Sequence, residues 1–210
     1  MAGAATSLYL GWTEGSSLPA GVGFAGGFAA GWPHALNQPA YFTFLSALLV
    51  CATSVMVAVR PGCRSGVFHA IRLAGIVQAI ITGLVFNVLL RSPDALTGVR
   101  LFNDTVLHVV MPVLVPLVWL AFGPHGRLSW RSVVFSAVIP LLWLAVTLAR
   151  GPWLDWYPYD IMDVSGLGYS GVMVYVVVIL AVYFLIASLI RILDGHLRRR
   201  DLPARDSSDA

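Results

Sequence analysis

Residues 169–193 read YSGVMVYVVVILAVYFLIASLIRIL, an apolar run whose one charged side chain is Arg191. A helix needs about 20 consecutive apolar residues to cross the hydrocarbon core of a bilayer. None of the long apolar runs alternates apolar and polar residues with a period of two, as membrane β-strands do. Together with the runs that precede it, this stretch predicts five helical spans, at residues 41–59, 67–90, 101–122, 130–149 and 169–193.

The composition agrees with a membrane protein. The chain has 210 residues, 58% hydrophobic and 11% charged, and its mean hydropathy is +0.81. A soluble domain carries about 25% charged residues. The sequence therefore predicts an all-α fold, a polytopic transmembrane helix bundle that forms a single integral membrane domain over residues 1–210. No basic patch is interleaved with aromatics, so we expect no nucleic-acid partner.

The placement of arginine predicts the orientation of the bundle. Loop 150–168 is acidic, with Asp155, Asp160 and Asp163, whereas two other loops and the tail are basic. The positive-inside rule places the basic segments, including the tail at 194–210, in the cytoplasm and predicts a multi-pass protein of the cell membrane. The arginines of these segments are Arg60, Arg64, Arg72, Arg127, Arg131, Arg191, Arg198, Arg199, Arg200 and Arg205.

The residues before position 41 fit the span pattern less well. The stretch LYLGW at 8–12 reads like the last turns of a helix, which suggests a truncated first span. Residues 18–32 are rich in glycine and alanine, and three glycines recur at four-residue spacing, as in close-packed membrane helices. This stretch is short and bounded by Pro19 and Pro33, so we expect an outer loop or a re-entrant segment.

The third predicted span carries the most informative polar residues. Asp104 and His108 are four apart, so they share one helix face. Pro112 lacks an N–H, which frees the carbonyl of His108 from its helical hydrogen bond. Histidine is a natural general base, and a neighbouring carboxylate can fix its tautomer. The alternative is a histidine that only hydrogen-bonds within the bundle.

A hydroxyl nucleophile is available near the start of the first predicted span. Thr43 and Ser46 are three apart on one face, and the orientation above puts Thr43 near the outer end of its helix. His108 lies at a comparable depth, about two turns inside its own helix. The alternative for Thr43 is a hydrogen bond to the carbonyls of its own helix.

Four further residues are candidates for binding the substrate or an oxyanion, namely Ser46, Asn87, Asn103 and Tyr157. Asn87 lies near the outer end of its span and could donate to an oxyanion. An interhelical hydrogen bond is the alternative role for this amide. Tyr157 belongs to the aromatic loop WLDWYPYD at 153–160, which forms either a lid over an outward-facing cavity or an interfacial belt.

Three of these pieces together resemble a known family. They are YFTFL at 41–45, the stretch 103–112 around His108, and WYPY at 156–159 before the last helix. In order and spacing the chain resembles the androgen-induced family of integral membrane hydrolases, and more closely its prokaryotic six-helix relatives. The eukaryotic members are threonine hydrolases that cleave fatty acid esters of hydroxy fatty acids. The resemblance implies that Thr43 is the nucleophile and His108 the base.

The sequence therefore favours a lipid-ester hydrolase with an intramembrane Thr/His site near the outer leaflet. Asp104 would orient His108, and an apolar ester substrate would enter from the lipid. We expect no cofactor and no metal, since Cys51 and Cys63 have no metal-ligand spacing. The alternative is a non-enzymatic membrane protein, either a small-solute carrier or an assembly factor. Nothing in the sequence indicates an oligomeric state.

Overall fold

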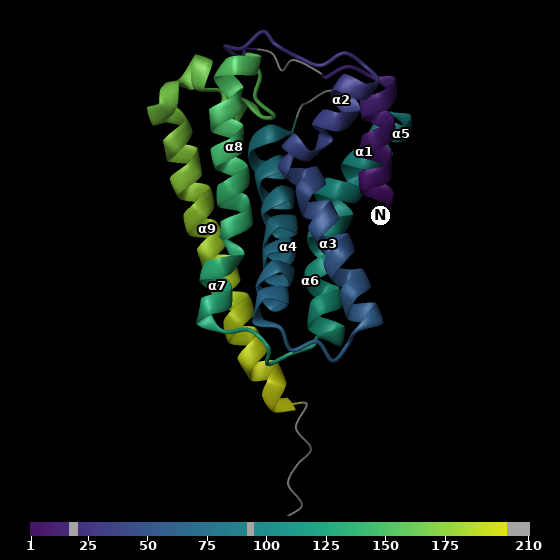
Figure 1. Ribbon diagram of the computed structural model, residues 1–210, viewed down its shortest axis with the longest axis vertical. Helices are drawn as coiled ribbons and strands as arrows, with labels where there is room; N and C mark the ends of the chain where they lie inside the picture. The colour runs from purple at the N-terminus through teal and green to yellow at the C-terminus, as the bar shows by residue number, and fades with distance from the viewer. Residues whose placement is uncertain (17–20, 92–94, 201–210) are drawn as a thin grey trace, which may run out of the picture.

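The computed structural model describes residues 1–16, 21–91 and 95–200, and within these residues the regular structure is helical, without strands (Figure 1). The all-α prediction is confirmed. The elements are α1 (Ala2–Thr13), α2 (Trp32–Asn37), η1 (Gln38–Ala40), α3 (Phe42–Val59), α4 (Gly66–Val85), η2 (Phe86–Leu90), α5 (Gly98–Thr105), η3 (Val106–Val110), α6 (Met111–Phe122), α7 (Trp130–Ser136), α8 (Val138–Leu154), η4 (Asp160–Met162) and α9 (Val164–Arg200). The segments η2 and η3 are π-helical, and η1 and η4 are 3₁₀ turns.

Within the part of the chain that the structure describes, five helical stretches are long and apolar enough to cross a membrane, so this is a multi-pass membrane protein. They are Phe42–Val59, Gly66–Leu90, Gly98–Phe122, Trp130–Leu154 and Val164–Arg198. The stretch Val164–Arg198 is interrupted at Gly168, whose φ of 67° is not helical. The span predicted at residues 169–193 begins directly after this interruption. Helix α9 continues into the predicted cytoplasmic tail as far as Arg200; residues 201–210 lie outside the described residues.

Helix α4 lies at the centre of the bundle, between α3, α6 and α9 (Figure 1). Its residues Leu73, Val77 and Ile81 form a buried cluster with side chains of the surrounding helices. Gly83 lets α6 approach closely, because a Cβ at this position would meet the Pro112 ring at 2.5 Å. This contact fixes the height of Pro112, and therefore of His108, against α4.

The N-terminal residues cover one side of the upper end of the bundle in Figure 1. Residues 2–13 form α1, in agreement with the helical reading of LYLGW, and α1 packs against α2, α3 and α5. The described part of the glycine-rich stretch, residues 21–31, forms a loop and no helix. This loop passes over the upper end to the α8–α9 connection, where Gly26 N–H donates to the Asp155 carbonyl at 2.7 Å.

Candidate active site

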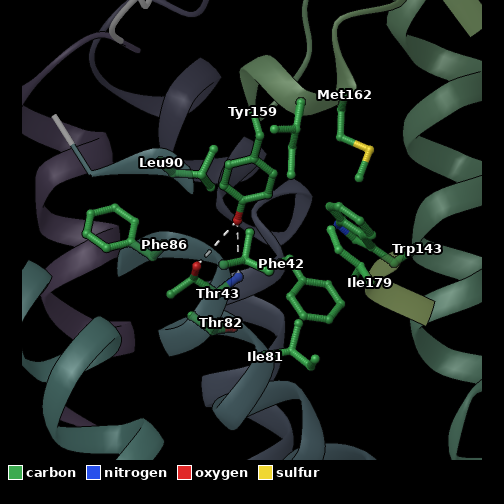
Figure 2. Close-up of a pocket in the computed structure, with 12 residues that line it drawn as sticks. Phe42, Thr43, Ile81, Thr82, Phe86, Leu90, Trp143, Tyr159, Met162 and Ile179 are labelled. Carbon is green, nitrogen blue, oxygen red and sulfur yellow. Dashed lines mark hydrogen bonds between the residues drawn. The ribbon is translucent and has the colours of Figure 1, made fainter. Parts of the chain in front are cut away.

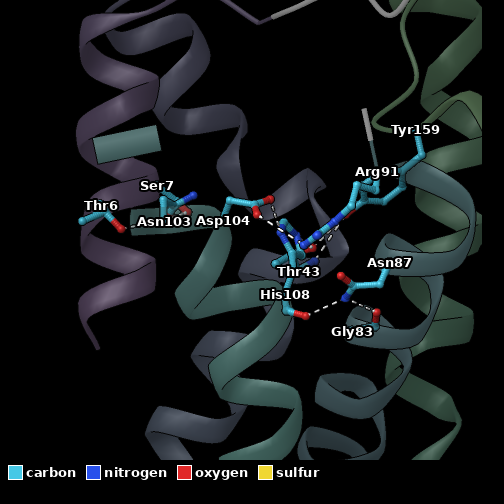
Figure 3. Close-up of polar contacts among 10 residues, drawn as sticks. All are labelled: Thr6, Ser7, Thr43, Gly83, Asn87, Arg91, Asn103, Asp104, His108 and Tyr159. Carbon is cyan, nitrogen blue, oxygen red and sulfur yellow. Dashed lines mark hydrogen bonds and ion pairs between the residues drawn. The ribbon is translucent and has the colours of Figure 1, made fainter. Parts of the chain in front are cut away.

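Thr43 occupies the first turn of α3, where backbone N–H groups have no partner within the helix. Its N–H donates instead to the hydroxyl of Tyr159 at 3.3 Å. The Thr43 side chain is 9% exposed, and its Oγ1 lies 3.4 Å from Nε2 of His108 (Figure 3). The structure thus brings together the two residues that the sequence paired, from helices that are distant in the chain.

His108 lies in the π-helical segment η3, one turn before Pro112. Such segments are frequent at functional sites. Pro112 leaves the carbonyl of His108 without its helical donor, and the Asn87 amide donates to this carbonyl at 2.8 Å. The ring of Phe86 stacks on the imidazole, with centroids 3.5 Å apart and planes 5° apart. The imidazole therefore has a fixed orientation.

Asp104 completes a linear chain of three side chains (Figure 3). Its Oδ1 lies 2.9 Å from Nδ1 of His108, one helical turn away, and both side chains are 14% exposed. Arg91 lies 4.0 Å from the other carboxylate oxygen. A carboxylate accepts from a protonated Nδ1, so the neutral imidazole presents an unprotonated Nε2 to Thr43. This is the arrangement that general-base activation of a hydroxyl requires.

Two cavities meet at Thr43, and one of them is almost wholly apolar while the other also has charged and amide groups in its lining. The apolar pocket has a volume of about 70 Å³ and lies between α3, α4, α8 and α9 (Figure 2). The polar cavity has a volume of about 420 Å³ and is lined by residues of α1, α2, α3 and α5 and by His108 of η3. Both cavities are lined by Thr43, Phe86, Leu90 and Tyr159.

The lining of the apolar pocket consists of Phe42, Thr43, Ile81, Thr82, Val85, Phe86, Leu90, Trp143, Tyr159, Ile161, Met162 and Ile179. Only two of these residues besides Thr43 carry a hydroxyl, namely Thr82 and Tyr159. The Thr82 hydroxyl is buried and has no hydrogen-bond partner in the structure. A chemically apolar group therefore fits this pocket, with polar groups available only near Thr43.

Tyr159 is the residue that the sequence analysis missed. Its hydroxyl lies 3.3 Å from Oγ1 of Thr43 (Figure 2), and its ring packs edge-on against Tyr41. Removal from water raises the pKa of Tyr159, while the hydrogen bonds from Thr43 act in the opposite direction. The phenol therefore remains protonated at neutral pH and can donate a hydrogen bond beside the Thr43 hydroxyl.

Tyr157 was predicted to contact substrate, and the structure places it elsewhere. Tyr157 is 2% exposed, packs against Gly151 and Phe24, and lines neither of the two cavities. Successive side chains of an extended segment point to alternate sides, so residues two apart ordinarily share a side. In the structure the two tyrosines have different contacts, Thr43 for Tyr159 and Phe24 for Tyr157, and the sequence alone did not distinguish them.

The other three candidates make structural hydrogen bonds. Ser46 is fully buried and its hydroxyl donates to the Thr43 carbonyl at 2.8 Å, so it is not the site hydroxyl. The Asn87 amide donates to the carbonyls of Gly83 and His108, which occupies both of its hydrogens. The expected oxyanion role of Asn87 is therefore not supported by its geometry.

Asn103 lines the polar cavity, but its side-chain oxygen is used to hold α1 (Figure 3). Thr6 donates to this oxygen at 2.6 Å and Ser7 donates to it at 3.1 Å. The amide therefore fastens the N-terminal helix over the site. Further along the same cavity, Glu14 pairs with Arg100 at 2.6 Å.

Within the described residues, no group of three or more His, Cys, Asp or Glu side chains is placed to hold a metal ion. Cys51 and Cys63 are free thiols. Comparisons of the chain with protein-family models, with curated proteins and with solved structures find no match. The relation to the androgen-induced hydrolases stays a prediction from the motifs.

Proposed function

We propose that this protein is an integral membrane lipid-ester hydrolase in which Thr43 is the nucleophile. The observation that carries the proposal is the chain from Asp104 through His108 to Thr43, which ends where the polar and apolar cavities meet. An ester likewise has two parts, acyl and alcohol, that extend in different directions from its carbonyl. The geometry supports hydrolysis better than transport, because it activates one hydroxyl.

In the proposed mechanism, Nε2 of His108 takes the proton of the Thr43 hydroxyl as its oxygen attacks the ester carbonyl carbon. Asp104 holds Nδ1 and stabilises the imidazolium that forms. His108 then gives the proton to the leaving alcohol, and an acyl-threonine remains. A water molecule, deprotonated by His108, releases the acid and restores Thr43. The 3.4 Å separation suits an unliganded site, where such bonds are often long.

Tyr159 supplies the best-placed donor for the oxyanion. Its oxygen accepts the Thr43 N–H, so the phenolic hydrogen is free to point toward the reacting carbonyl. A preorganised donor in a water-poor site stabilises the charge that develops in the transition state. The unpartnered Thr82 hydroxyl lines the same pocket and is a second donor within it.

The proposed location is the cell membrane, with the C-terminus in the cytoplasm and the site in the outer half of the bilayer. The basic loops support this orientation. In Figure 1 the acidic loop 155–163 lies at the upper end of the bundle, and α3 descends from below α2 to the lower end, where Arg60 follows it. The positive-inside rule places the end that carries Arg60 and Arg64 in the cytoplasm.

The test uses protein purified in detergent, a panel of lipid esters and a fluorophosphonate probe for the activated hydroxyl. Thr43→Ala and His108→Ala should each abolish ester hydrolysis, and Thr43→Ala should abolish labelling. Thr53→Ala is the matched control, because Thr53 lies on the same helix with its hydroxyl bonded to the Leu49 carbonyl. Wild-type protein that neither reacts with the probe nor cleaves any ester would refute the proposal and favour a carrier or an assembly factor.

A further inference from the structure

The position of Thr43 divides any bound ester into two halves. The pocket on one side is lined by apolar side chains, and its few polar atoms lie near the attacking hydroxyl. The cavity on the other side is lined by charged and amide side chains together with apolar ones, and it has about six times the volume. An ester bound across Thr43 would therefore have its acyl chain and its alcohol in different environments.

We propose that the apolar pocket binds the acyl half of the ester and that the polar cavity binds its alcohol half. This proposal rests on the proposed hydrolase function. The preferred substrates are then short-chain acyl esters of uncharged, hydroxyl-rich alcohols. Phe42 determines the length of the acyl chain. These assignments follow from the volume of the apolar pocket, from its end wall and from the charges of the polar cavity.

The volume limits the acyl chain. Each water-sized group needs roughly 10–15 Å³ of cavity volume, so the apolar pocket of about 70 Å³ holds about five or six carbon atoms. A second apolar pocket of about 60 Å³ adjoins the first. The wall between them consists of residues that line both pockets, namely Phe42, Ile81, Trp143, Met162 and Ile179.

Phe42 is the part of this wall that can be removed with the least disturbance. Its ring packs against Trp143 with centroids 4.9 Å apart (Figure 2), and the Trp143 indole N–H donates to the Ala40 carbonyl at 2.9 Å. Ile81 belongs to the buried core of the bundle, whereas Phe42 packs at its edge. Shortening Phe42 should join the two pockets and nearly double the space for an acyl chain.

The charges of the polar cavity favour an uncharged alcohol. Glu14 is paired with Arg100, and Asp104 with His108 and Arg91. Asp160 accepts from its neighbouring backbone N–H and has no cationic partner within the described residues. A phosphate or carboxylate on the alcohol would meet this uncompensated negative charge, whereas hydroxyls would meet hydrogen-bonding groups.

The acyl half is tested with p-nitrophenyl esters, which keep the leaving group constant. We expect kcat/KM of the wild type to rise about fourfold per methylene of the acyl chain up to about six carbons, and then to rise no further. The chain length at which this rise stops is called the break. In Phe42→Ala the rise should continue to about ten carbons. Phe42→Leu, a milder change, should move the break in the same direction if the alanine variant does not fold.

Phe44→Ala is the matched control for chain length. Phe44 flanks Thr43 on the other side in sequence and lines the polar cavity but not the apolar pocket. Its substitution should leave the break at about six carbons. A break that is absent in the wild type, or that Phe44→Ala moves as far as Phe42→Ala, would overturn the assignment of the acyl subsite.

The alcohol half is tested by comparing a short-chain monoacylglycerol with the same acyl group on glycerol phosphate. The uncharged ester should be cleaved about tenfold faster or more. Faster cleavage of the phosphate-bearing ester would overturn the alcohol assignment. These outcomes differ from failure of the proposed function, in which the wild type would cleave no ester.

Discussion

Tyr159→Phe isolates one hydroxyl group of the candidate site. The substitution keeps the ring and its edge-on packing against Tyr41. It removes a donor that lies 3.3 Å from Oγ1 of Thr43, and it removes the acceptor for the Thr43 N–H at 3.3 Å. Loss of the donor weakens the stabilisation of the transition state, and loss of the acceptor lowers the stability of the start of α3.

The two losses have different magnitudes. Removing an oxyanion donor lowers kcat by about 10²- to 10³-fold, or about 3 to 4 kcal/mol of transition-state stabilisation. Leaving one backbone N–H without its partner costs about 1 to 2 kcal/mol of folding stability. Because the donor acts on a charge that develops only in the transition state, KM should change little.

The measurement is steady-state hydrolysis of a short-chain p-nitrophenyl ester by detergent-purified protein, with kcat and KM determined separately. Tyr157→Phe is the control, since Tyr157 is buried against Gly151 and Phe24, away from the cavities. Burial raises the pKa of Tyr159, so its ionisation should cause no loss of activity below about pH 10. A Tyr159→Phe variant that keeps a kcat within about threefold of the wild type would refute the oxyanion assignment.

Three further predictions concern the site and its orientation. Asp104→Asn should lower kcat by about 10²-fold or more, because an amide no longer fixes the His108 tautomer, and kinetics of the folded variant measure this. Asn87→Leu should lower the free energy of unfolding by about 1 kcal/mol, which a lower melting temperature would show, while kcat falls by less than about tenfold. A larger fall in kcat would restore the oxyanion role of Asn87. A topology reporter fused after Arg200 should be active in the cytoplasm, and one inserted at Asp155 should be active outside; the reverse pattern would invert the bundle.

The spans and part of the site could be read from the sequence because the signals are local. Hydropathy identifies a membrane helix without knowledge of its neighbours. The four-residue spacing of Asp104 and His108 places them on one helix face, and their hydrogen bond follows from that spacing alone. The short length of the stretch 18–32 and its flanking prolines likewise indicated an outer loop or a re-entrant segment, and the described residues 21–31 form a loop.

The partners of these residues across the bundle could be found only in the tertiary structure. Hydropathy does not determine how far each helix is rotated about its axis, and this rotation depends on close packing such as that of Gly83 against Pro112. That rotation decides that Asn87 reaches the His108 carbonyl and that Phe86 stacks on the imidazole. The fold of the 156–163 loop likewise decides that Tyr159, and not Tyr157, reaches Thr43. The sequence by itself determined the membrane helices and the Asp104–His108 pair, whereas the packing between helices decided which groups surround Thr43.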